Sequence, residues 1–249
     1  MSRLFKRIEQ AGKATPAPMG FAARREERVP PILLGVVASR PEEVASALAA
    51  APDAFLFTSS SPKDLDALAE AAKEAPWGIA TVPWSATLAE KALQRGADFL
   101  VVDFGAPLEA LNREDLGRIV RLPKDVPEEV AGALEPLPID GVLLAEPQRP
   151  PFSLGSAVEL AVWRGKVPRP VLVQVERPPS LWELETLRDM GISMLLVAAS
   201  AVKPSAMEEL RQHILSLPHR RTSKERPVPL LPQVSLSAQP PPEEEEEEE

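Results

Sequence analysis

The chain has 249 residues, of which 44% are hydrophobic, and carries a formal net charge of −9. This length is enough for a single domain with a full-size core. The chain has neither cysteine nor tyrosine, which excludes disulfides, thiolate metal sites and cysteine nucleophiles. No apolar run reaches the roughly 18 residues of a membrane span, and the chain begins without the apolar core of a secretory signal. We therefore expect a cytoplasmic protein without a membrane span.

The negative charge is unevenly distributed along the chain. Seven glutamates occupy 243–249, whereas residues 1–30 hold seven Lys or Arg against three acidic residues, and residues 219–226 hold four against one. The remaining body is acidic and would repel a phosphate backbone, so we expect no nucleic-acid binding. The glutamate run suits a basic partner or the chain's own basic segments, although most such runs are simply solvated.

The beginning of the chain predicts a short amphipathic helix. Leu4, Phe5, Ile8 and Ala11 share one helical face, opposite several basic side chains, and Gly12 is suited to end the helix. We expect this helix to pack on the bottom of the domain that follows or to fray in solution, with membrane-surface docking as the weaker alternative. The Pro-, Ala- and Arg-rich stretch after it resembles a linker, so residues 1–30 are assigned to a basic arm.

From residue 31 to residue 217, short apolar runs alternate with helical stretches, which is typical of βα units around a parallel sheet. The runs are almost continuously apolar, as expected for strands covered on both faces. The weakest helix lies between Leu108 and Gly117. The eight expected strands are ILLGVVA (32–38), AFLFT (54–58), GIATVP (78–83), DFLVVD (98–103), IVRL (119–122), DGVLLA (140–145), PVLVQV (170–175) and SMLLVA (193–198).

Five helices are expected to begin at a side chain that can accept hydrogen bonds from the first turn. In each case an acidic residue follows three positions later and favours the helix N-terminus. The expected N-caps are Ser39, Ser61, Asp125, Ser180 and Ser205.

Every second strand is entered through a similar sequence, which indicates how the strands are arranged. The entries APDAFLF (51–57), GADFLVV (96–102), PIDGVLL (138–144) and GISMLLV (191–197) favour a two-strand unit used four times. Such a repeat predicts a closed (β/α)8 barrel of the α/β class over 31–217. An open doubly wound sheet is the alternative, but it usually has a glycine-rich turn after the first strand, where this chain has VVASRPEE.

The entries GADFLVVD and PIDGVLL resemble those of aldolase-type TIM barrels, and the layout is similar to that of uncharacterised bacterial barrel proteins. The resemblance implies an architecture and carries over no activity.

Ligands of such barrels bind at the mouth formed by the C-terminal ends of the strands. Asp103, Arg121 and Glu146 lie at or just after the ends of three adjacent strands, and Glu176 follows the seventh, so we expect these four to form a polar, catalytic pocket. They could hold a divalent cation such as Mg²⁺ or perform acid–base chemistry on a small carboxylated substrate. The alternative is an ion-pair network that only rigidifies the mouth. Further ligand-binding candidates are Trp84, Gln174, Ser200 and Lys203.

Several common barrel chemistries lack their residues here. The loops after the last two strands, ERPPSL and AASAVKPS, have no phosphate-binding glycines, and no strand carries a lysine suited to a Schiff base. His213 and His219 lie on or beyond the last helix and do not predict a metal site. Two functions therefore remain open. One is a small-molecule-binding, lyase- or isomerase-like barrel; the other is a catalytically degenerate barrel that acts as an interaction or scaffold protein.

The last segment, 218–249, is expected to be disordered, because its Pro-rich and poly-Glu composition has too little apolar content to form a core.

Overall fold

The structure is a computed structural model that describes residues 2–11, 29–58 and 61–218. The linker and the C-terminal tail expected from the sequence lie outside these residues, except for positions 29, 30 and 218. None of the helices in the described ranges is both long enough and apolar enough to cross a membrane.

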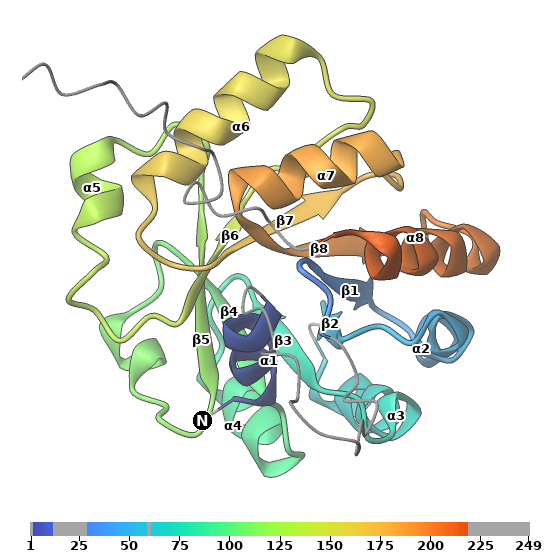
Figure 1. The fold of residues 1–249 in the computed structure, drawn as a ribbon. Coiled ribbons are helices and arrows are strands. Elements are labelled where there is room, and N and C mark those ends of the chain that lie inside the picture. The colour runs from blue at the N-terminus through green and yellow to red at the C-terminus, as the bar shows by residue number, and fades with distance from the viewer. Residues whose placement is uncertain (1, 12–28, 59–60, 219–249) are drawn as a thin grey trace, which may run out of the picture.

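Eight parallel strands pair in chain order and close into one barrel, with β8 paired to β1 (Figure 1). All eight strands expected from the sequence are present, which confirms the (β/α)8 TIM barrel. The strands are β1 (Leu33–Ala38), β2 (Ala54–Phe57), β3 (Trp77–Thr81), β4 (Phe99–Asp103), β5 (Gly117–Leu122), β6 (Gly141–Leu144), β7 (Val171–Val175) and β8 (Ile192–Ala198).

Side chains alternate between the interior of the barrel and the layer of helices around it. On β4, Phe99 and Val101 pack inside the barrel, whereas Leu100 and Val102 pack beneath the helices. The same alternation on every strand decides which polar side chains at the strand ends face the mouth.

Helices surround the barrel, but their cover is uneven (Figure 1). The connection between β4 and β5 contains only the 3-10 turn η2 (Leu108–Leu111), which confirms the weak helix expected there. The helix after β5 is also short. The other elements are α2 (Pro41–Ala47), η1 (Leu48–Ala50), α3 (Pro62–Ala72), α4 (Ala86–Gln94), α5 (Glu128–Gly132), α6 (Leu154–Lys166), α7 (Leu181–Met190) and α8 (Pro204–Ser216).

Two of the five expected N-caps are confirmed, because Ser61 and Ser180 accept a backbone N–H from the first turn of α3 and α7. The other three predictions are wrong by one or two residues. A proline takes the first position of α2 and α8, where its fixed φ suits a helix start, and this sets the cap at the residue before it. The observed caps of α2, α5 and α8 are Arg40, Pro127 and Lys203.

The first helix, α1 (Arg3–Ala11), lies across the end of the barrel where the strands begin (Figure 1). Its buried face consists of Leu4, Phe5, Ile8 and Ala11, as the sequence predicts. β5 and β6 begin with Gly117 and Gly141, and a Cβ at either would lie 2.7 or 2.8 Å from the Phe5 ring. The two glycines therefore make room for Phe5, which closes the bottom of the barrel.

Two buried carboxylates hold α1 in place. Asp98, just before β4, accepts hydrogen bonds from the Ser2 hydroxyl at 2.7 Å and from the backbone N–H of Leu4 at 2.8 Å. Asp53, just before β2, binds Arg7 of α1 and Arg211 of α8, each at 2.7 Å. Asp53 is only 1% exposed, and its two direct ion pairs connect α1 at the bottom of the barrel to the outer helix α8.

Candidate functional site at the mouth of the barrel

Three polar side chains face the barrel axis at the C-terminal ends of the strands. Asp103 lies two positions after Val101, Arg121 two after Ile119 and Gln174 two after Leu172, and all three preceding residues pack inside the barrel. Because side chains alternate along a strand, the three polar residues share that inward direction. All three are partly buried. They form the polar layer above the apolar interior.

Asp103 and Arg121 are register partners on β4 and β5. Within the described residues, the Asp103 carboxylate nevertheless makes no hydrogen bond or ion pair. Arg121 turns toward the other side and donates from Nη2 to the backbone oxygen of Ala145, at the end of β6, over 3.0 Å. A guanidinium has five N–H donors, so this single hydrogen bond leaves most of them available. A free carboxylate and a mostly free guanidinium thus face the same space.

The structure does not bring Glu146 and Glu176 into this group. Glu146 is exposed at the rim and accepts a hydrogen bond from the backbone N–H of Lys124 at 3.1 Å. Glu176 accepts from Arg149 Nε at 2.7 Å in an ion pair whose side chains are 45% and 81% exposed. This pair raises the pKa of Arg149 through the hydrogen bond and the opposite charge. The four residues expected to form one pocket are therefore divided between the barrel axis and the rim.

The other expected ligand-binding residues occupy different surroundings. Gln174 faces the axis, as described above. Trp84 packs against the core between the strands and the helices. Ser200 and Lys203 are exposed beyond the end of β8, and Lys203 is the N-cap of α8.

The arrangement offers little to a metal ion. Within the described part of the chain, no three acidic or histidine side chains are grouped closely enough to bind one. Metal sites for Mg²⁺ or Ca²⁺ need several oxygen ligands, and Asp103 alone supplies one carboxylate. The idea that three carboxylates share a cation has no geometric support among these residues.

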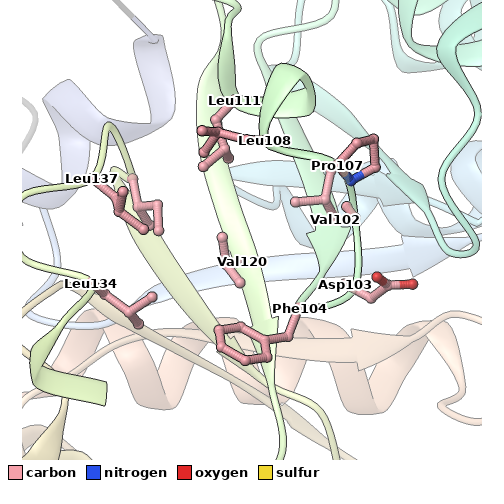
Figure 2. Close-up of a pocket in the computed structure, with 11 residues that line it drawn as sticks. Val102, Asp103, Phe104, Pro107, Leu108, Leu111, Val120, Leu134 and Leu137 are labelled. Atoms are coloured by element: carbon pink, nitrogen blue, oxygen red, sulfur yellow. The ribbon is translucent and has the colours of Figure 1, made fainter. Parts of the chain in front are cut away.

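An apolar pocket of about 140 Å³ lies outside the barrel, next to β4 and β5 (Figure 2). It opens where η2 replaces a full helix. Figure 2 shows the Asp103 carboxylate directed away from this pocket, whereas Phe104 of the same loop lies beside it. Phe104 and Leu108 are 52% and 69% exposed. This pocket was not predicted from the sequence, although large apolar residues in a segment with weak helical character are the signal that could have indicated it.

Comparisons with known proteins identify the fold and nothing finer. No protein-family model matches the chain. A search of curated proteins also finds no match. Solved structures do match, each with a sequence identity that shows the fold alone. Thiamine phosphate pyrophosphorylase from Pyrococcus furiosus is 16% identical, with a TM-score of 0.55 over 74% of this chain and 96% of that one.

Two further structures give similar values. KGPDC from Streptococcus mutans is 13% identical, with a TM-score of 0.57 over 74% of this chain and 97% of that one. The alpha subunit of tryptophan synthase from Legionella pneumophila is 11% identical, with a TM-score of 0.58 over 87% of this chain and all of the other. The chain therefore shares the barrel of several distant enzymes.

Proposed function

We propose that the mouth of the barrel binds a small carboxylic acid and moves a proton on it, in a lyase- or isomerase-like reaction. The observation that carries this proposal is the pair of inward side chains Asp103 and Arg121, adjacent in register and not bound to each other.

Arg121 is suited to hold the carboxylate of the substrate. A guanidinium binds a carboxylate through two parallel N–H···O hydrogen bonds, which fixes both position and orientation. The hydrogen bond to the Ala145 oxygen holds Arg121 at the end of β5 and leaves other N–H groups available. The acid bound in this way would lie over the barrel axis.

Asp103 is suited to act as the general base. Its free carboxylate can accept a proton from the carbon next to the bound carboxylate or to a carbonyl, and the electron pair of that C–H bond moves into the adjacent C=O group to give an enolate. The protonated Asp103 returns the proton to a neighbouring carbon in an isomerase, or to solvent after a leaving group departs in a lyase. Arg121 stabilises the negative charge that develops in either case.

Thermal unfolding with a panel of small carboxylic acids and phosphate esters tests the binding. A ligand present at about 100 times its Kd stabilises the folded protein by about 2.7 kcal/mol, which is readily measured. We expect at least one carboxylic acid to stabilise the wild-type protein and to lose this effect in Arg121→Lys. Arg118→Lys is the matched control, since Arg118 lies on the same strand but pairs with Asp140 at 3.0 Å, away from the mouth.

Exchange of a substrate proton in D2O tests the chemistry separately. We expect Asp103→Asn to bind the same acid and to lose incorporation of deuterium from solvent. If no acid stabilises the wild-type protein more than the Arg121→Lys variant, the proposed binding is wrong. If Asp103→Asn exchanges protons at the wild-type rate, the role of Asp103 is wrong.

The second candidate, a barrel that acts by binding another protein, is favoured by a different observation. Glu146 and Glu176 are engaged at the rim, so of the three carboxylates expected in the pocket only Asp103 faces the axis. A barrel that acts only by binding another protein should show no exchange of a substrate proton with any acid of the panel.

A further inference from the structure

The outer surface between α6 and α7 carries an unusual concentration of exposed apolar side chains. Five of the nine exposed large hydrophobic residues of the described chain lie there. Leu154 is 83% exposed and Trp182 72%. Contiguous apolar surface of this kind normally marks a binding site. We call this surface the α6/α7 face, made of Leu154, Val158, Val162, Leu181 and Trp182.

A groove of about 300 Å³ runs between the two helices, which lie side by side (Figure 1). Its walls are mostly apolar, with Ala157, Ala161 and Met190 beside three residues of the face, Leu154, Val158 and Trp182. The one acidic side chain in its lining is Glu183, whose carboxylate already binds Ser180 and the backbone N–H of Phe152. The groove therefore fits an apolar occupant better than a polar one.

We propose that the C-terminal segment 227–236 of the same chain binds this groove in an extended conformation. The segment reads PVPLLPQVSL and contains every Val, Leu, Ile, Met, Phe and Trp residue of 219–249. Three prolines in ten residues favour the polyproline II conformation, which loses little entropy on binding. Proline-rich segments are typically bound by grooves lined with aromatic side chains, and Trp182 supplies that side chain here.

The point at which the chain leaves the described structure places this segment within reach. Arg188, near the end of α7, donates from Nη1 to the backbone oxygen of Pro218 at 2.9 Å. Nine residues, 219–227, connect Pro218 to Val228, and a flexible chain of that length spans about 17 Å on average. Trp182 precedes Arg188 by six residues, or about 9 Å along the helix axis. A tether of this length gives an effective concentration on the order of millimolar.

Electrostatic attraction also favours a path of the chain from Pro218 to the groove. A chain that runs from Pro218 to the groove crosses α7, where Glu185 and Asp189 are at least partly exposed, although Asp189 already pairs with Arg188 at 2.9 Å. The connecting residues 219–226 hold four basic residues and one acidic residue. Attraction between exposed charges is weak for each pair, but it selects one direction for the chain.

Trp182 provides a reporter for the test in the full-length protein. The other three tryptophans are buried or partly buried, so Trp182 dominates any change in solvent exposure. We expect the double variant Leu230→Asp/Leu231→Asp to release the segment and expose Trp182. Its tryptophan fluorescence should then shift to longer wavelength and be quenched more strongly by acrylamide. Ser237→Asp with Gln239→Asp adds the same charge outside the segment and should leave both unchanged. In a Trp182→Phe background, the Leu230 and Leu231 substitutions should no longer alter the emission.

Backbone amide hydrogens of α6 and α7 should exchange faster with solvent in the Leu230→Asp/Leu231→Asp variant. In the Ser237→Asp/Gln239→Asp control they should exchange at the wild-type rate. Unchanged emission and exchange in the Leu230→Asp/Leu231→Asp variant would overturn the proposal. Light scattering tests whether a second copy of the chain covers the α6/α7 face instead. In that case the wild-type protein would be dimeric, and its Trp182 fluorescence would depend on protein concentration.

Discussion

Asp103 and Arg121 stand side by side at the ends of β4 and β5, yet Arg121 binds the backbone oxygen of Ala145 and leaves Asp103 without a partner among the described residues. An ion-pair network that rigidifies the mouth would have joined them. Their separation is the reason to look for a ligand between them.

The first prediction concerns the stability cost of removing this carboxylate. We expect Asp103→Asn to change the free energy of unfolding by no more than about 0.5 kcal/mol, because the side chain loses no partner. Urea unfolding followed by circular dichroism measures the change. A loss of more than about 2 kcal/mol would mean that Asp103 serves a structural network.

The second prediction concerns Asp53, the buried acid beneath the barrel. Asp53→Asn should lower the free energy of unfolding by about 3 kcal/mol, because it leaves Arg7 and the largely buried Arg211 without their counter-charge, although Arg7 keeps some contact with solvent. The same unfolding experiment measures the loss. Asp115→Asn, at an exposed position, is the control and should leave the midpoint nearly unchanged. A small loss at Asp53 would show that solvent compensates both guanidinium groups and that these ion pairs do not hold α1 in place.

The third prediction concerns the fit between Phe5 and Gly141. Phe5→Ala should destabilise the protein by about 3 to 5 kcal/mol through the cavity that it leaves. Gly141→Ala should also destabilise it, because the new Cβ would lie 2.8 Å from the Phe5 ring. In the double variant the second substitution should cost clearly less than it does alone, since the ring that it clashes with is absent. Strictly additive losses would show that Phe5 does not occupy this position.

The fourth prediction concerns Glu183 and pH. Burial alone would raise the pKa of Glu183, but hydrogen bonds from Ser180 and from the backbone N–H of Phe152 outweigh it and lower the pKa. Its stabilising effect is therefore fully present above the pKa of the unfolded chain and is lost as the pH falls through the lower, folded value. We expect Glu183→Gln to cost about 2 kcal/mol at neutral pH.

The difference between Glu183→Gln and wild type should shrink below about pH 4, the range in which an unperturbed glutamate titrates. Thermal unfolding across the acid range measures this convergence. Glu176→Gln, which affects only an exposed ion pair, is the control and should show no comparable pH dependence. A Glu183→Gln cost that stays constant down to pH 2 would contradict the assignment.

The fold could be predicted from the sequence because each strand carries its own local signal. Continuous apolar runs separated by helical stretches located all eight strands, and the weak segment from Leu108 to Gly117 contains only a 3-10 turn. Helix starts were harder. Ser61 and Ser180 act as caps, whereas the starts of α2 and α8 are set by Pro41 and Pro204, whose preference for the first helical position competes with a nearby serine.

The candidate site could be predicted only in part. Asp103 and Arg121 were expected at the mouth because a charge facing the helices would be costly, and Gln174 was a further candidate; all three belong to strands, whose alternation turns them toward the axis. Glu146 and Glu176 follow their strands, where alternation no longer applies, and their partners Lys124 and Arg149 come from other loops. Contacts between loops depend on the closed barrel, and no local pattern in the sequence encodes them.

The position of α1 against the bottom of the barrel also constrains the order in which its contacts can form. The helix precedes every strand in the chain, yet its first turn binds Asp98, 94 residues after Leu4, and Phe5 lies against the beginning of β6. Contacts between such distant positions form slowly, since a long loop must close first. Phe5 can therefore close the bottom of the barrel only once β5 and β6, more than a hundred residues further along the chain, are in place.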